Sequence, residues 1–369
     1  MQIIEVEFIP YALPFVKPYV TARGTLAERE IGLIRLVTDE GLVGLGEAVP
    51  LSLRGGADMA AVERGVRKAA RRLRKAGLSD FAGNDPLRSA IDVFIHTCAG
   101  RKLPAPAKAA IEMALFDLAG KASSTPVWKL LGAELAEPVA CNATLVAGTP
   151  AAVAADAERW AEDGFHTFKL KLGTGDDVAA VRAVRDSLDP DAGIRVDANA
   201  AWSVAEATGV LKMIEPLEVE LIEQPVAGMR EMAEITAATT VLVVADESVA
   251  GTKDAARAAR AGACDAATVK LSKVGGIGEA NGVASHLPIY LSSALDGPVG
   301  IAAAAHAAQA LAFTGPTAGL AHGLATQLLF SETIASRACE LDGDLLTVPN
   351  GPGLGVEIEA KALESHRIE

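Results

Sequence analysis

The stretch FKLKLG at residues 168–173 is a short apolar run that carries two lysines separated by one residue. In a β-strand, side chains two residues apart point to the same face, so Lys169 and Lys171 should lie side by side, opposite the apolar residues. Taken alone, the pattern is typical of an edge strand that uses lysines against pairing with other chains. Its place in a larger repeat favours a second interpretation, in which the strand forms one wall of a site.

The stretch belongs to a series of repeating units that begins after Pro138. Each unit is about two dozen residues long and consists of a short β-rich run followed by an Ala-rich helical segment. Strands that alternate with helices at this interval predict βαβ units, and eight of them predict a closed parallel barrel. A doubly wound open sheet is the alternative, but it would favour a GxGxxG turn after the first strand, and residues 144–150 contain none. The strand-like runs begin near Val139, Phe165, Ile194, Val219, Val241, Ala266, Ile289 and, less clearly, Thr317.

The sequence outside the repeat predicts an α+β block. We expect this block to span residues 1–135, the barrel to span 136–334, and a tail at 335–369 to pack back on the first block. Two irregular segments, Pro18–Arg29 and Pro50–Asp58, suit mobile loops that close over a substrate.

Charge and composition limit the classes of partner. A formal net charge of −13 over 369 residues argues against nucleic acid or an anionic membrane as the main partner. The sequence has no apolar run that could span a bilayer and no basic-then-apolar signal pattern. Its four cysteines are widely separated, which favours neither a disulfide framework nor a zinc cluster. We therefore predict a soluble cytoplasmic enzyme for a small molecule, and leave open whether it forms a homo-oligomer.

Polar residues recur where the predicted strands end, which is where barrel enzymes carry their functional groups. Asp197, Glu223, Asp246 and Lys270 follow four successive strands, one repeat apart. The three carboxylates should converge as hard oxygen ligands for a divalent cation, with Mg²⁺ as the natural occupant and Mn²⁺ as a substitute. Each carboxylate could instead cap the helix that follows it. Three in register, flanked by lysines, favour the metal site.

The second and sixth of eight barrel strands lie opposite each other, so Lys171 and Lys270 should face each other across the cation. A carboxylate substrate between them could lose its α-proton to a lysine while the cation neutralises the charge that develops. A lysine needs a lowered pKa to act as a base at neutral pH, and the charges of Lys169 and the metal would lower the pKa of Lys171. The pattern predicts enolate chemistry.

The order KxK, DxN, EQP, DES and KxSK-GG resembles the muconate-lactonizing branch of the enolase superfamily over nearly the whole chain, and residues 109–132 resemble the end of that family's capping domain. The resemblance implies an α/β fold, namely a modified TIM barrel of the (β/α)7β type with an α+β capping domain. A lysine base with Mg²⁺ is the known arrangement of that superfamily. The residues it assigns are Asp197, Glu223 and Asp246 as Mg²⁺ ligands, Lys171 and Lys270 as the acid/base pair, Lys169 as the modulator of Lys171, and Asn199 and Glu247 as supports around the ligands.

The reaction is predicted from segments near the last strands. Dipeptide epimerases of this branch carry an Asp-x-Asp pair after the last strand, whereas residues 321–326 read AHGLAT, so epimerisation of dipeptides is disfavoured. The run SSALDGPVG at 292–300, together with AHGL at 321–324, resembles o-succinylbenzoate synthases of menaquinone biosynthesis. This resemblance predicts a carbon–oxygen lyase in which Lys171 removes the α-proton, Lys270 stabilises charge, and water leaves.

Several alternatives stay open at this point. An N-acylamino acid racemase, or another racemase or epimerase, would use both lysines to exchange protons, and a muconate-type cycloisomerase would share the same scaffold. A metal-binding scaffold without turnover is a further alternative, but it would be expected to have lost a polar strand end, and none is lost. Ser293, at the end of the seventh strand, and His322, near the last, are the candidate substrate contacts.

Overall fold

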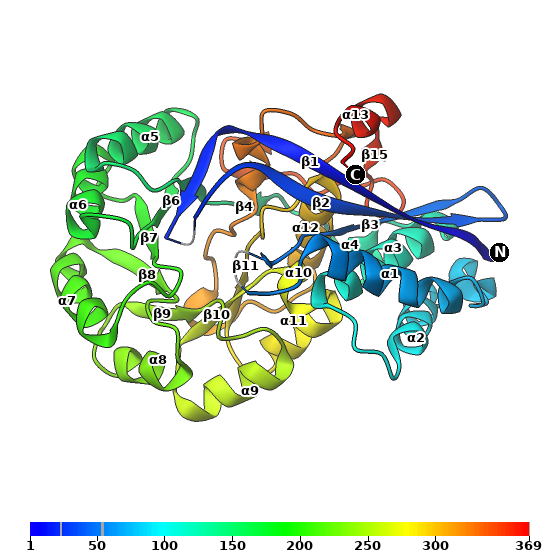
Figure 1. The fold of residues 1–369 in the computed structure, drawn as a ribbon, viewed down its shortest axis with the longest axis horizontal. Coiled ribbons are helices and arrows are strands. Elements are labelled where there is room, and N and C mark those ends of the chain that lie inside the picture. Colours follow the sequence, from blue (N-terminus) through cyan, green and yellow to red (C-terminus); the bar gives the residue numbers. More distant parts are fainter. Residues whose placement is uncertain (23, 53–54, 369) are drawn as a thin grey trace.

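The computed structural model describes residues 1–22, 24–52 and 55–368. The chain begins with a three-stranded antiparallel sheet of β1 (Ile3–Thr21), β2 (Gly24–Thr38) and β3 (Val43–Ala48), in that order. β1 and β2 form one long hairpin that reaches from the N-terminal side of the molecule toward β6 of the barrel (Figure 1). The first block thus extends over the barrel.

The two predicted loops differ in outcome. Pro18–Arg29 was predicted to be irregular, and this is wrong, because Tyr19 pairs with Leu26 and Thr21 with Gly24 to form the end of the hairpin. The register shifts between Pro14 and Tyr19, which is the irregularity that the prolines impose by lacking a backbone donor. Arg23 lies outside the described residues. In the segment Pro50–Asp58 the described residues form turns, and Leu53 and Arg54 lie outside them.

Helices α1 (Met59–Leu73), α2 (Pro86–Cys98), α3 (Ala105–Ala122) and α4 (Val127–Leu130), with the 3-10 turn η2 (Ser79–Ala82), complete the first block. α3 is buried from Pro106 to Gly120, except at Lys108, because it packs on β3 on one side and on the barrel helix α10 (Leu271–Val274) on the other. Glycine is required where β3 meets α3, since a Cβ on Gly46 would lie 1.9 Å from the carbonyl oxygen of Ala110.

Seven parallel strands follow in sequence order, each paired with its predecessor, and the helices cover their outer face (Figure 1). The predicted α/β barrel class is therefore confirmed. The strands are β5 (Ala143–Leu145), β6 (Thr167–Lys171), β7 (Gly193–Asp197), β8 (Val219–Glu223), β9 (Leu242–Ala245), β10 (Ala266–Val269) and β11 (Ile289–Leu291). The other helices are α5 (Pro150–Glu162), α6 (Asp177–Ser187), α7 (Val204–Ile214) with η3 (Glu215–Leu217), α8 (Met229–Thr236), α9 (Thr252–Ala261), α11 (Ile277–Ala284) and α12 (Pro298–Ala308).

The last strand departs from the prediction. Thr317 ends the 3-10 turn η4 (Gly315–Thr317), so the strand predicted to begin there is wrong; a proline and a glycine favour a turn at this point. The barrel is closed instead by two parallel bridges, from His322 to Cys141 and from Gly323 to Ser292. The predicted first strand at Val139 is β4 (Val139–Ala140), which pairs with the tail strand β14 (Leu345–Leu346) outside the barrel.

The tail runs back along the first block. After η5 (Ala325–Leu329) come β12 (Ala335–Arg337), β13 (Leu341–Asp342), β15 (Glu357–Ile358) and α13 (Ala360–Ser365). The backbone N–H of Ala12 in β1 donates to the carbonyl of His366 at 2.9 Å, and Tyr11 forms a bridge with Arg367. The domain boundaries given above stay a prediction.

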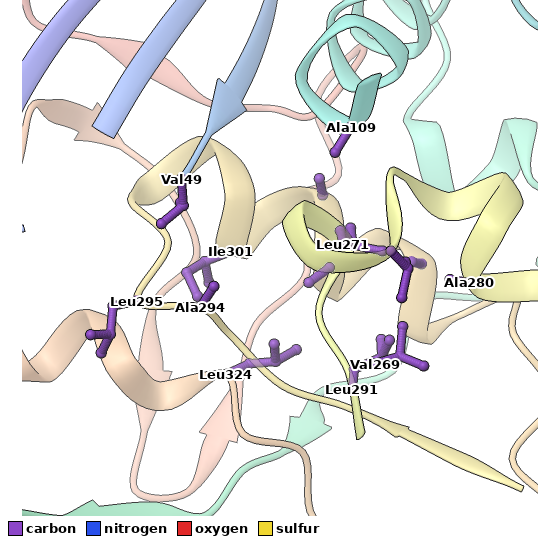
Figure 2. Packing of buried hydrophobic residues seen from close by; sticks show 14 of the residues in the cluster. Val49, Ala109, Val269, Leu271, Ala280, Leu291, Ala294, Leu295, Ile301 and Leu324 are labelled. Carbon is purple, nitrogen blue, oxygen red and sulfur yellow. The ribbon is translucent and has the colours of Figure 1, made fainter. Parts of the chain in front are cut away.

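One continuous apolar core joins the first block to the barrel. Figure 2 shows part of it: Val49, which follows β3, points toward Ala294 and Ile301, and Ala109 of α3 points toward Leu271 of α10. Because these side chains share one core, the first block is held firmly against the strand ends. Among the described residues, no helix has the length and apolarity that crossing a bilayer would need.

Candidate active site

A narrow cleft lies at the carboxyl ends of the barrel strands, between the end of the β1–β2 hairpin and the barrel. Its free volume is about 60 Å³, well below the few hundred Å³ typical of a ligand site, so an organic acid enters only if lining side chains move. The residues that line it are Tyr19, Thr21, Arg29, Pro50, Leu51, Thr144, Lys169, Lys171, Asn199, Lys270, Ser292, Ser293, Ala294, Leu295 and Thr326.

The three predicted lysines meet in this cleft with their ammonium groups on carboxylates. On β6, Lys169 Nζ lies 2.6 Å from Glu223 Oε2 and 3.0 Å from Asp197 Oδ2, and Lys171 Nζ lies 2.7 Å from the same Asp197 oxygen. Lys270, directly after β10, places its Nζ 2.5 Å from Asp246 Oδ2 and 3.6 Å from Glu223 Oε1. The two-residue spacing on β6 thus brings both lysines to one face, as the strand periodicity requires.

The three predicted metal ligands are completely buried and lie on neighbouring strands. The register pairs Lys171 with Asp197 and Asp197 with Glu223, so their side chains share one level at the ends of β6, β7 and β8. Asp246 follows β9 directly. Buried carboxylates are costly unless they are paired, and the lysines provide that compensation.

Electrostatics in the cleft favour the charged forms of both partners. Burial opposes ionisation of Asp197, but the ammonium groups of Lys169 and Lys171 outweigh it and hold its pKa well below the ordinary value. Burial is also the largest single influence against the charged form of Lys171, and the Lys169 charge adds to it, but the charges of Asp197, Tyr19 and Glu223 together outweigh both and raise the pKa of Lys171. The lowered pKa predicted for Lys171 is therefore not what this arrangement produces. A lowered pKa of Lys171 requires that the negative charge of Asp197 be shared with a further cation.

Three supporting residues were missed at the sequence level. Glu223 Oε2 accepts hydrogen bonds from Tyr290 Oη at 2.5 Å and from Thr268 Oγ1 at 2.8 Å. Lys273 Nζ lies 2.9 Å from Asp246 Oδ1. Thr268 could have been found, because it stands two residues before Lys270 and shares its face of the strand. Tyr290 sits in an apolar run and gives no such signal.

Asn199 and Glu247 lie next to each other beside Lys171. Asn199 Oδ1 accepts from Lys171 Nζ at 3.3 Å, and Asn199 Nδ2 donates to Glu247 Oε1 at 3.3 Å. Asn199 and Gln224 have positive φ angles of 46° and 40°, which is strained for residues with a side chain and is typical of functional turns. Gln224 Oε1 accepts from the backbone N–H of Asp246 at 2.9 Å and so fixes the turn after β9.

The two predicted substrate contacts lie in different surroundings. Ser293 lines the cleft, and its hydroxyl donates to Asp296 Oδ2 at 3.0 Å. His322 is buried and is not among the described residues that line the cleft. Its Nδ1 accepts a hydrogen bond from the backbone N–H of Leu291 at 3.1 Å. Burial and the nearby Arg195 lower the pKa of His322 to about 4, so its ring is neutral. Its visible role is to close the barrel.

The donor set has the chemistry of a site for a hard divalent cation, since it offers three carboxylates from successive strands. Glu223 Oε1 is buried and has no hydrogen-bond partner among the described residues, which leaves an oxygen suited to a cation. However, no three His, Cys, Asp or Glu side chains in residues 1–22, 24–52 and 55–368 lie together as a metal cluster. The lysine ammonium groups lie on the carboxylate oxygens, so the residues fit a cation once the lysines release those oxygens.

Comparison with known protein families gives matches to two parts of the chain. Residues 152–362 match the enolase C-terminal domain-like family, and residues 3–132 match the N-terminal domain family of mandelate racemase and muconate lactonizing enzyme. The chain therefore belongs to the mandelate racemase and muconate lactonizing enzyme group of the enolase superfamily, and it is an enzyme of that class.

Individual relatives of the chain are isomerases by name. Muconate cycloisomerase 1 of Acinetobacter baylyi is 31% identical, with 98% of each chain covered. L-Ala-D/L-Glu epimerase of Bacillus subtilis is 30% identical, covering 96% of this chain and 97% of its own, and N-succinyl-L-Arg/Lys racemase of Bacillus cereus is 27% identical, covering 99% and 97%. These names are cycloisomerase, epimerase and racemase. They support the alternatives left open by the sequence better than the predicted o-succinylbenzoate synthase, and they support neither the lyase assignment nor menaquinone biosynthesis.

Solved structures give the same picture. The muconate lactonizing enzyme of Pseudomonas fluorescens, complexed with muconolactone, superposes with a TM-score of 0.90 at 28% identity and covers 99% of this chain and 98% of its own. The dipeptide epimerase of Enterococcus faecalis V583, complexed with Mg and the dipeptide L-Leu-L-Tyr, superposes with a TM-score of 0.88 at 27% identity, covering 97% and 100%.

Proposed function

We propose that this chain is a divalent-cation-dependent isomerase that removes the proton α to a substrate carboxylate, gives an enediolate, and returns a proton to the same carbon. The observation that carries this proposal is the pair of buried lysines, Lys171 and Lys270, which line one cleft from different strands. Two acid/base groups in one cleft suit the exchange of a proton on either side of a carbon atom.

Asp197, Glu223 and Asp246 would hold the cation, with Asn199 and Glu247 around them. Mg²⁺ suits these oxygen ligands, Mn²⁺ would substitute, and a related epimerase structure contains Mg. When bound, the cation supplies positive charge to the carboxylate of the substrate.

The chain's own residues would carry the proton. Lys171 removes it from the α-carbon, and Lys270 returns one from the other side; for the opposite enantiomer the roles exchange. Lys169 stays on Glu223, where its charge lowers the pKa of Lys171; the neutral, basic form of Lys171 becomes accessible once a cation shares the charge of Asp197. Tyr19 and Thr21 at the end of the hairpin would limit the access of water to the cleft.

The lining of the cleft indicates the substrate class. Four cations line it, Arg29 and the three lysines, whereas no Asp or Glu lines it among the described residues. A substrate with a free ammonium group would have no partner there, which disfavours free dipeptides, while a carboxylate whose amine is acylated fits. We therefore propose racemisation of an N-acylamino acid, with Ser293 as a contact to the substrate; a contact by His322 would require its ring to leave the barrel closure.

Cycloisomerisation of a muconate-type dicarboxylate is the second candidate, favoured by the related enzyme that was solved with muconolactone. Dehydration to o-succinylbenzoate is supported only by the sequence resemblance of residues 292–300. All three reactions pass through an enolate next to a carboxylate, so a substrate panel must separate them. The panel consists of N-acylamino acids, dipeptides, muconolactone and the cyclohexadiene carboxylate precursor of o-succinylbenzoate.

Isotope exchange tests the proposal. Each enantiomer of the accepted N-acylamino acid is incubated in D₂O with Mg²⁺ and the wild type, Lys171→Gln, Lys270→Gln or the exposed control Lys212→Gln. Loss of one acid/base group should reduce racemisation by about 10²- to 10⁴-fold. Each lysine variant should still incorporate deuterium into one enantiomer, and a different one for each variant. Racemisation that survives in both variants would exclude the two-lysine mechanism.

A further inference from the structure

A second cavity lies away from the strand ends, between α2 and α3 of the first block and the segment that follows α10. Its volume is about 660 Å³, within the range of small-molecule sites. Its walls are mainly apolar and include Ile91 and Phe94 of α2, Phe116 of α3 and Leu311. Ile95 on its rim is 59% exposed and adds an accessible apolar side chain to the entrance.

Two cations that form no ion pair with any described residue also line this cavity. Arg101 follows α2, and its Nε is buried without a hydrogen-bond partner; Lys108 lies in the first turns of α3. Within the described part of the chain, neither side chain forms an ion pair or a hydrogen bond. Both act on the Cys98 thiol in the same wall and lower its pKa, although burial dominates and raises that pKa to about 11. The two positive charges therefore converge on one part of the cavity.

The carboxylates in the wall are already satisfied. Glu112 accepts hydrogen bonds from the backbone N–H groups of Ile277 and Gly278 at the start of α11. Glu279 Oε2 accepts from the hydroxyl of Thr252 at 2.8 Å. Neither acid pairs with Arg101 or Lys108, so the cations remain available for a ligand. A buried donor left without an acceptor is costly, and an anionic ligand would remove that cost.

We propose that this cavity is a second ligand site, distinct from the strand-end cleft, for a small organic anion with an apolar body. The hydrocarbon part would lie against Phe94 and Phe116, and the anionic group would accept hydrogen bonds from Arg101 and Lys108. The size of the cavity, its apolar walls and its two unpaired cations each point to this class of ligand. The site does not depend on which reaction the cleft catalyses.

Fluorescence titration with two matched probes tests the site. Anilinonaphthalenesulfonate supplies an apolar body with one negative charge, and phenylnaphthylamine supplies nearly the same body without a charge. The wild type should bind one sulfonate probe per chain. Arg101→Gln should weaken its binding about tenfold and Lys108→Gln about threefold, whereas the neighbouring exposed Lys102→Gln should change it less than twofold. The neutral probe should bind all four proteins alike.

A rim variant locates the probe. Ala310 is exposed and lines the cavity, so Ala310→Trp should block entry and weaken both probes while the thermal unfolding midpoint stays unchanged. Equal loss of both probes in Arg101→Gln would overturn the role of charge. If none of the substitutions at Arg101, Lys108 and Ala310 changes the binding of the sulfonate probe, the probe binds elsewhere and the proposed site is refuted. If the probe fluorescence per chain instead rises on dilution while light scattering shows that the protein dissociates, the occupant of the cavity is a second copy of the chain.

Discussion

Glu47 should make the stability of this protein fall as the pH rises from acid to neutral. The residue is in β3 and completely buried, and its carboxylate accepts hydrogen bonds from the backbone N–H groups of Gly297, Val299 and Gly300 at the start of α12. Burial, followed by the charge of Asp296, raises the pKa of Glu47 to about 7, although the three hydrogen bonds lower it. The carboxylate thus joins the first sheet to the barrel.

The size of the effect follows from linkage. The folded pKa of about 7 lies above the ordinary value of 4.5. Between these values the folded chain binds more protons than the unfolded chain, so the free energy of unfolding decreases as the pH rises through this window and levels off above about 7. Because a difference of one in pKa is worth ~1.4 kcal/mol, the loss of unfolding free energy is at most about 3.5 kcal/mol. Glu112, whose burial raises its pKa to about 7, should add a loss of the same sign.

Urea unfolding at about pH 5 and about pH 8 measures this loss. The variant Glu47→Gln should lose less stability between the two pH values than the wild type, because glutamine does not titrate. Glu134→Gln, at an exposed position, is the matched control and should keep the slope of the wild type. If Glu47→Gln loses stability as steeply as the wild type, Glu47 is ionised throughout, and the raised pKa is refuted.

Three further predictions concern packing and the strand ends. Gly46→Ala should lower the free energy of unfolding by about 1 to 3 kcal/mol, since its Cβ would meet the Ala110 carbonyl, whereas Gly209→Ala has no neighbour within 4 Å and should be neutral or stabilising in thermal unfolding. EDTA should abolish turnover and added Mg²⁺ should restore it; activity that persists in EDTA would contradict the three-carboxylate site. Thr268→Val removes one of the hydrogen-bond donors to Glu223. If that hydrogen bond contributes ~1.4 kcal/mol to cation binding, the Mg²⁺ concentration for half-maximal activity should change about tenfold, while the substrate preference should stay unchanged. A preference that shifts with Thr268 would refute this role.

The chemistry-bearing residues could be predicted because local rules place them. The two-residue period put Lys169 and Lys171 on one face, and the regular repeat put Asp197, Glu223 and Asp246 on successive strand ends. Both rules act over short stretches of chain. The structure adds what those rules do not describe, which is that the lysines occupy the carboxylate oxygens, and that the carboxylate charges raise rather than lower the pKa of Lys171.

Long-range contacts were beyond the sequence. Glu47 contacts residues about 250 positions away, and Glu112 contacts the start of α11 more than 160 positions away, and no local pattern predicts either pairing. The barrel closure at His322 was misplaced for a related reason, because two bridges are too short to produce a strand-like pattern. The hairpin end was misjudged because prolines mark turns in most contexts, whereas here the register shifts and resumes after them.

The contrast between local patterns and long-range contacts also applies to the reaction class and the choice of substrate. The lysines and carboxylates sit on or directly after strands held in register, so the first proton transfer depends on a rigid framework. The rest of the cleft lining comes from the hairpin, the segment after β3, the turn after β11 and η5, which meet only through tertiary packing. Glu47 fixes the turn that carries Ser293 by binding the N-terminus of α12, and Ser293 contacts Asp296 in that turn. Substitutions at the Glu47 contact should therefore alter the Michaelis constant before they alter the proton-exchange rate, because they move the lining and leave the strands in place.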